Sequence, residues 1–123
     1  MPRIVIVEDD AFLAQMYASK LKLEGFTVHT APDGQQGLVL IQRERPDAVL
    51  LDILLPKMDG FAVLEAIRKD PGTVHIPVLL LTNLSQKGDV DRGLSLGAND
   101  YLIKSHFVPT EVVAKIHALI GDA

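Results

Sequence analysis

Cysteine is absent from the 123 residues, and so are long apolar runs. Without cysteine, the chain can form neither a disulfide framework nor a thiolate metal site. No apolar run approaches the roughly 20 residues that a membrane span requires. The apolar stretch at the N-terminus is too short before its acidic residues to be a secretory signal. We therefore expect a reduced, cytoplasmic compartment and no membrane insertion.

An excess of charge of one sign is also absent. The chain has 12 basic and 16 acidic residues, a net charge of -4, which leaves no broad basic footprint for nucleic acid. We therefore expect no direct contact with nucleic acid. The hydrophobic share of 48% suits one globular domain with a single core, and no internal repeat, low-complexity segment or linker interrupts it. Residues 1–123 are thus assigned to a single domain.

Short apolar runs alternate with longer amphipathic segments. Three of the runs are apolar at successive positions, which is typical of strands covered on both faces of a parallel sheet. The predicted strands are residues 3–7, 26–30, 48–51, 78–82 and 101–103. The predicted helices run from about residue 13 to a stop at Gly25, from 33 to 45, from 61 to 69, from about 86 to 96, and onward from Pro109.

Strand and helix therefore alternate five times along the chain. Right-handed crossovers then give an α/β fold, a parallel five-stranded sheet with helices on both faces. For a doubly wound sheet of this size, the pattern favours a flavodoxin-like (βα)5 sandwich with strand order 2-1-3-4-5.

Polar residues gather where the predicted strands end. Ligands of such a sheet bind beyond the carboxyl ends of its strands, at the point where the strand order switches. The residues at these ends are Glu8, Asp9, Asp10, Asp52, Thr82 and Lys104. Because Asp52 closes its strand at this crevice, we expect it not to be deeply buried.

Several carboxylates at close range either hold protons or hold a cation. Oxygen ligands without cysteine favour a hard ion, and Mg²⁺ is the first choice. The set indicates phosphoryl chemistry: Asp52 as the nucleophile, Lys104 offsetting charge on the phosphoryl oxygens, and Thr82 donating a hydrogen bond.

Each of these residues also has a purely structural interpretation. Asp10 is better placed to cap the following helix than to bind a ligand. Asp52 could form an ion pair with Lys104 and do nothing else. Taken alone, Thr82 is a β-branched strand residue and Tyr101 a partly buried aromatic. Because polar residues occur together at the ends of four strands, the functional interpretation is favoured over the structural one.

Four ordered motifs extend over essentially the whole chain: "IVIVEDD", "LLDILLPKMDG", "LLLT" and "GANDYLIK". Together they resemble the receiver domain of bacterial two-component response regulators, and the chain is similar to the single-domain chemotaxis regulators. The resemblance implies that Asp52 accepts a phosphoryl group from a phosphohistidine of a sensor histidine kinase or phosphotransfer protein.

The resemblance also implies the remaining roles. Asp9, Asp52 and the backbone carbonyl of Leu54 would coordinate Mg²⁺, with Glu8 acting mainly through a bound water. Thr82 and Lys104 would hold the phosphoryl oxygens, as would the backbone N–H of Asn83. Thr82 and Tyr101 would form a switch pair that changes the affinity of the face made by the fourth helix, fifth strand and fifth helix for a downstream protein partner.

The chain departs from the family pattern in two places. Ser105 follows Lys104 where the family usually has proline after a cis bond, and a cis bond to another residue is costly. We expect a trans bond with a shifted loop in preference to a strained cis bond. Asn83 replaces a smaller residue and could narrow access for small phosphodonors.

Two further features bear on regulation. Leu54 and Leu84 occupy the positions that tune phosphate lifetime, and neither orients an attacking water, so we expect slow self-dephosphorylation. Gly88 and Gly93 weaken the fourth helix. That weakness fits a frayed surface helix as well as a tuned switch.

The resulting prediction is a phosphorylation-dependent signalling module without an output domain. It would catalyse its own phosphorylation and dephosphorylation and would not be an enzyme in the usual sense. The alternatives are a pseudo-receiver that binds partners without phosphorylation and a receiver fragment of a larger regulator or hybrid kinase. A flavodoxin-like cofactor binder is disfavoured by the acidic "EDDAF" loop, and an aspartate phosphohydrolase by Leu54 in place of a second acid.

Overall fold

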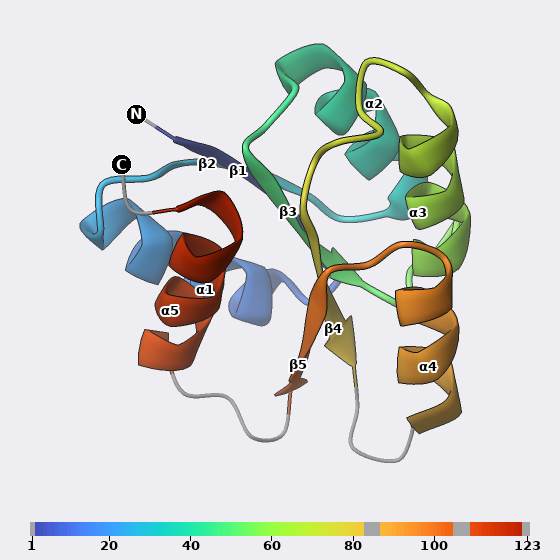
Figure 1. The fold of residues 1–123 in the computed structure, drawn as a ribbon. Helices are drawn as coiled ribbons and strands as arrows, with labels where there is room; N and C mark the ends of the chain where they lie inside the picture. The colour runs from blue at the N-terminus through green and yellow to red at the C-terminus, as the bar shows by residue number, and fades with distance from the viewer. Residues whose placement is uncertain (1, 83–86, 105–108, 122–123) are drawn as a thin grey trace.

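The structure is a computed structural model, which describes residues 2–82, 87–104 and 109–121. Strands and helices alternate along these ranges (Figure 1). The strands are β1 (Arg3–Val7), β2 (Thr27–Ala31), β3 (Ala48–Asp52), β4 (Val78–Thr82) and β5 (Asp100–Ile103). The helices are α1 (Ala11–Leu23), α2 (Gly34–Glu44), α3 (Gly60–Lys69), α4 (Lys87–Ser95) and α5 (Pro109–Ile120). No helix in these ranges has the length and apolar character needed to cross a bilayer.

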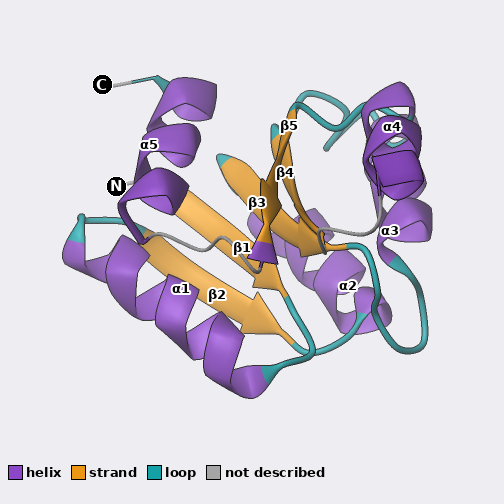
Figure 2. Ribbon diagram, turned by 90° about the horizontal axis from the view of Figure 1, so that it is seen from below, coloured by secondary structure: helices purple, strands orange, loops and turns teal. Residues whose placement is uncertain are grey.

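The strands form one parallel sheet in the order β2-β1-β3-β4-β5, which confirms the predicted fold and strand order. Helices α1 and α5 cover one face, while α2, α3 and α4 cover the other (Figure 2). The strand order reverses between β1 and β3, so these two neighbours open the crevice at the carboxyl edge.

The alternation of side chains explains the continuous apolar runs. Ile4 and Ile6 of β1 pack with α1 and α5, whereas Val5 and Val7 pack against the opposite layer. All four are fully buried. A strand covered on both faces needs apolar residues at every position, which is why the runs predicted a parallel sheet.

Small shifts separate the predicted from the observed elements. The second strand begins at Thr27, one residue later than predicted, because Thr27 pairs in register with Arg3 of β1. Phe26 lies just before it and belongs to the core. Helix α2 ends at a left-handed residue, Arg45, whose φ is 46°, directly before Pro46.

The two glycines of α4 differ in their surroundings. A Cβ added to Gly93 would overlap Cδ1 of Leu80 in β4, whereas a Cβ on Gly88 would meet no atom within 4 Å. Gly93 is therefore needed for the close approach of α4 to the sheet. Gly88 only lowers the helix propensity of the first turns.

Candidate functional site

Carboxylates from β1 and β3 meet at the carboxyl edge of the sheet. Glu8 follows β1 directly, and Asp52 is the last residue of β3. One oxygen from each of Glu8, Asp9 and Asp52 lies within 4.8 Å of the others. Asp9 is exposed, while the other two are buried. The parallel register of β1 and β3 thus brings together acids that are far apart in the sequence.

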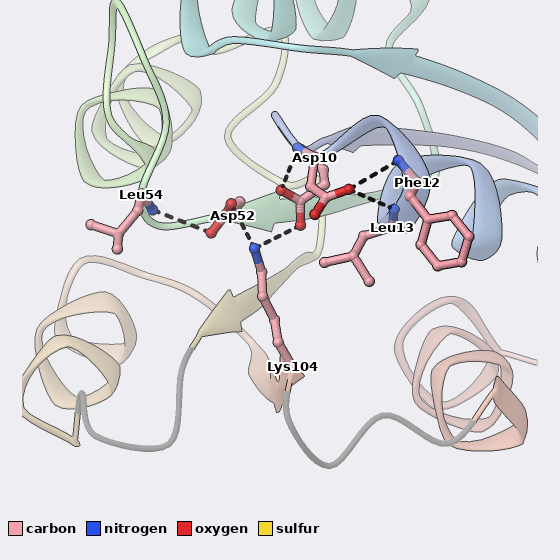
Figure 3. A network of polar contacts seen from close by, with 7 residues as sticks. Asp10, Phe12, Leu13, Asp52, Leu54 and Lys104 are labelled. Carbon is pink, nitrogen blue, oxygen red and sulfur yellow. Dashed lines mark hydrogen bonds and ion pairs between the residues drawn. The ribbon is translucent and has the colours of Figure 1, made fainter.

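Lys104 reaches this cluster from the end of β5 (Figure 3). Its Nζ lies 2.7 Å from Oε1 of Glu8 and 2.8 Å from Oδ2 of Asp52. The other oxygen of Asp52, Oδ1, accepts a hydrogen bond of 3.2 Å from the backbone N–H of Leu54. Both oxygens of Asp52 are therefore held in defined directions.

The expectation that Asp52 is not deeply buried is wrong. Its exposed fraction is 3%, and that of Glu8 is 2%. The flanking layers cover β3 as far as its last residue, and the Lys104 side chain lies against the carboxylate. The burial is tolerated because the ammonium and the Leu54 N–H replace the contacts that water would make.

The electrostatics of the cluster are coupled. Burial, followed by the neighbouring Asp52 carboxylate, raises the pKa of Glu8 to about 7, although the hydrogen bond from Lys104 acts to lower that pKa. Burial lowers the pKa of Lys104, but the hydrogen bonds and charge attraction to Asp52 and Glu8 outweigh it and leave that pKa raised. Lys104 therefore stays a cation at neutral pH.

Asp10 serves the helix, as predicted. Its Oδ1 accepts hydrogen bonds from the N–H groups of Phe12 at 2.9 Å and Leu13 at 3.1 Å, which cap α1 (Figure 3). Its own N–H donates to Oε2 of Glu8 at 3.2 Å. Because the cap uses the Asp10 side chain, Asp9 is the acid left at this turn to bind a cation.

Thr82 and Tyr101 lie on the same face of the sheet. Thr82 pairs in register with Ile103, and Leu80 pairs with Tyr101. Leu80 packs in the layer of α2 and α3, so alternation places Thr82 and Tyr101 on that face too. Thr82 is buried at the carboxyl edge, whereas Tyr101 is 37% exposed.

The structure thus brings Glu8, Asp9, Asp52, Leu54 and Lys104 together, with Thr82 at a neighbouring strand end. The predicted roles of Asn83 and Leu84 lie outside the described residues, as does the Lys104–Ser105 bond.

The sequence reasoning missed a second group beside the site, Asp33 and Gly34 at the start of α2. They contact the loop that follows Asp52. The only signal in the sequence is the Asp-Gly pair that follows β2 after Pro32, and such a pair indicates no more than the start of a helix.

The donor set suits a hard divalent ion. Its three carboxylates offer oxygen atoms alone and are close enough to share one ion. Two acids at the end of β1, an acid at the end of β3, a hydroxyl on β4 and a lysine after β5 form the arrangement that the four motifs predicted. A family model, the response regulator receiver domain, matches residues 4–117. The chain belongs to this family.

Curated relatives of this receiver domain include two DNA-binding regulators. The DNA-binding dual master transcriptional regulator RpaA of Synechocystis sp. (strain ATCC 27184 / PCC 6803 / Kazusa) is 42% identical over 120 residues, which cover 98% of this chain and 49% of RpaA. The DNA-binding response regulator MtrA of Mycolicibacterium paratuberculosis is 43% identical over 116 residues, 94% of this chain and 50% of MtrA. The chain spans about half the length of these relatives.

Solved receiver domains share the fold. The chemotaxis response regulator CheY4 of Vibrio cholerae superposes with a TM-score of 0.90 at 28% identity, covering 97% of this chain and 98% of CheY4. The receiver domain of a sensor histidine kinase from Pseudomonas aeruginosa PAO1, with a magnesium ion coordinated in its active site cleft, gives 0.89 at 31% identity, covering 98% of both chains. The present chain is therefore a receiver domain of the kind used in two-component systems.

Proposed function

We propose that this receiver domain is controlled by phosphorylation of Asp52, with a phosphohistidine of a sensor histidine kinase or phosphotransfer protein as the donor. The observation that supports this most directly is the way Asp52 is held. Lys104 contacts one of its oxygens, the Leu54 N–H contacts the other, and two further acids lie beside it. A carboxylate needed only for an ion pair with Lys104 would not need these additional acids.

The step is a transfer between two side chains. An oxygen of the Asp52 carboxylate attacks phosphorus, the P–N bond to the donor imidazole breaks, and that nitrogen keeps the electron pair. The product is an acyl phosphate. Lys104 offsets charge on the phosphoryl oxygens, while Thr82 donates a hydrogen bond to one of them.

A divalent cation, Mg²⁺, would be held by Asp9, Asp52 and the backbone carbonyl of Leu54, with Glu8 acting through water. When bound, it would neutralise charge on the transferring group. These residues offer the oxygen ligands that Mg²⁺ prefers, which is the support for this choice. The protein would thus promote its own phosphorylation and dephosphorylation without acting as an enzyme on a separate small substrate.

Phosphorylation would act on the face formed by α4, β5 and α5. The Thr82 hydroxyl would move toward the phosphoryl group and the exposed ring of Tyr101 would turn inward, changing the affinity of this face for a protein target. The proposed compartment is the cytoplasm. The relatives named above are DNA-binding regulators, so a receiver within a longer regulator is the main alternative to a module without an output domain. The absence of direct nucleic-acid contact by these residues stays a prediction.

The test is phosphorylation of the isolated protein. After incubation with a small phosphodonor and Mg²⁺, intact mass should rise by one phosphoryl group, and the gain should vanish with EDTA and in Asp52→Asn. Asp47→Asn, an exposed aspartate whose Oδ2 contacts the Arg3 N–H at the amino end of β1, is the matched control and should be phosphorylated like the wild type. If the wild type stays unmodified even with a cognate kinase, the pseudo-receiver alternative replaces this proposal.

A further inference from the structure

Asp33 is a buried acid outside the carboxylate cluster. It is 4% exposed and caps α2, with Oδ1 accepting from the N–H of Gln36 at 2.8 Å and Oδ2 accepting from Nε2 of the same residue at 2.8 Å. Its Oδ2 also lies 3.9 Å from Nζ of Lys57. Capping explains the contacts with Gln36. The contact with Lys57 joins α2 to the loop that follows β3.

The backbones meet even more closely at the next residue. The Gly34 N–H donates to the carbonyl oxygen of Pro56 at 3.3 Å. A Cβ on Gly34 would overlap the carbonyl oxygen of Met58. The β3–α3 loop, residues 53–59, therefore rests on the first turn of α2 at a distance that only glycine permits.

The far end of the same loop is closed against β3. The Gly60 N–H donates to the Ile53 carbonyl at 2.9 Å, and a Cβ on Gly60 would overlap the carbonyl oxygen of Asp52. Leu54 lies between these two attachments, with its N–H directed at Asp52. The direction of the Leu54 backbone is thus fixed from both sides.

Lys57 shows that the loop is held in an unfavourable conformation. Its φ is 68°, in the left-handed region that side chains other than glycine rarely adopt. Such a residue persists where its surroundings leave no alternative. Here the surroundings are Asp33 and Gly34, which contact Lys57 and its two neighbours.

We infer that Asp33 and Gly34 are positioning residues of the cation site: by supporting the β3–α3 loop, they direct the Leu54 carbonyl and so set the affinity for Mg²⁺. This inference rests on the proposed function, because it assumes that the backbone of Leu54 contacts the ion. Neither residue reaches the carboxylate cluster itself. Their effect passes through the loop, as the effect of residues behind the ligands usually does.

The experiment titrates the full chain with Mg²⁺ alone by isothermal calorimetry, without a phosphodonor. Gly34→Ala should weaken binding by roughly tenfold, in the range found for residues behind metal ligands. Gly93→Ala is the matched control, since its Cβ would overlap Leu80 in another part of the fold. It should lower the melting temperature, yet bind Mg²⁺ within about twofold of the wild type, because it leaves the loop untouched.

Asp33→Asn tests the same inference with less disturbance of the fold. The amide oxygen can still cap α2, but the charge that faces Lys57 is removed, so Mg²⁺ binding should weaken by about threefold. Wild-type affinity in both Gly34→Ala and Asp33→Asn would overturn the inference while leaving the proposed function intact. If Gly34→Ala does not fold, wild-type Mg²⁺ affinity in Asp33→Asn is by itself enough to overturn the inference. If the wild type itself binds no Mg²⁺, the proposed function and the inference fail together.

Discussion

Nζ of Lys104 lies 2.7 Å from Oε1 of Glu8, a carboxylate that the fold buries almost completely. The same ammonium contacts Asp52, so one cation serves two buried acids. A divalent ion bound at this cluster would have to share the two carboxylates with this ammonium. Lys104 is therefore an internal counter-ion of the cation site as well as a candidate ligand of the phosphoryl group.

Replacing Lys104 should have opposite effects on stability and on metal binding. Lys104→Met leaves Glu8 and Asp52 buried without their ammonium, and removing one partner of a buried pair costs about 3–5 kcal/mol. The measured loss should be at the lower end, because Glu8 can take up a proton. Mg²⁺ affinity should rise, since the competing cation is gone, while phosphorylation should fall. Denaturant unfolding with and without Mg²⁺ measures the first two effects.

Lys115→Met is the control for this variant. Lys115 pairs with Asp100 at 3.0 Å, but both side chains are partly exposed, at 28% and 37%. A pair of this kind contributes less than about 1 kcal/mol. A Lys104→Met protein as stable as Lys115→Met, with unchanged Mg²⁺ affinity, would show that Lys104 is not the counter-ion of the cluster.

Tyr17 should make the protein sensitive to alkaline pH. Burial, with the nearby Glu8 carboxylate, raises the pKa of its hydroxyl from 10.0 to about 12. The folded state therefore keeps this proton to higher pH than the unfolded state does. The contribution of this hydroxyl to the free energy of unfolding is fully present below about pH 10. It is lost as the pH rises toward about 12, and the loss is roughly 2–3 kcal/mol at most. Unfolding midpoints of the wild type and Tyr17→Phe, compared from about pH 8 to about pH 10.5, should diverge only at the alkaline end; parallel curves would contradict the assignment.

The two glycines of α4 provide a matched pair. Gly88→Ala should stabilise the protein by up to about 1 kcal/mol, because alanine is the better helix former and the position is open. Gly93→Ala should destabilise it, because the new Cβ overlaps Leu80. Combining Gly93→Ala with Leu80→Val should cost less than the two single changes added together. Denaturant unfolding of the wild type, Gly93→Ala, Leu80→Val and the double variant measures this. If the double variant loses as much stability as the two single variants together, the proposed contact is excluded.

Helix α4 is either part of the switch or a frayed surface helix, and hydrogen exchange separates these two interpretations. Hydrogen exchange of the helix, with and without a fluoroberyllate mimic of the phosphoryl group, should slow on addition of the mimic if α4 is part of the switch. A helix that is merely frayed would exchange equally fast in both conditions, and Gly88→Ala would slow exchange without any effect of the mimic.

The fold was predictable from the sequence because the three central strands, β1, β3 and β4, are covered on both faces. Runs such as residues 3–7 and 78–82 have no polar alternation to confuse with a helix, and the amphipathic segments between them are long enough to cross over. The residues of the site were predictable for the same reason. Once the sheet is parallel, Glu8, Asp52 and Lys104 can only meet at one edge.

What the sequence did not reveal depends on contacts between elements. The burial of Asp52 follows from where the Lys104 side chain lies, which the position of Lys104 in the chain does not specify. From the sequence, Gly93 only weakens the fourth helix and Gly34 only lies in the first turn of the second, yet each permits a close approach, to Leu80 and to Met58 respectively. Such a requirement for glycine can be recognised only when the residue that it packs against is known.

The last prediction concerns how long a phosphoryl group on Asp52 would survive. Leu54 is 55% exposed, its backbone N–H donates to Asp52, and its side chain has no polar atom to orient water. Leu54→Asn supplies such an atom, and the loss of phosphate should become several-fold faster. The double variant with Leu84→Glu should be faster still. Leu23→Asn, an exposed leucine at the far end of α1, is the control and should match the wild type. The decay of the phosphorylated mass over time, after removal of the phosphodonor, gives each rate, and a double variant no faster than the parent would refute the role of both leucines.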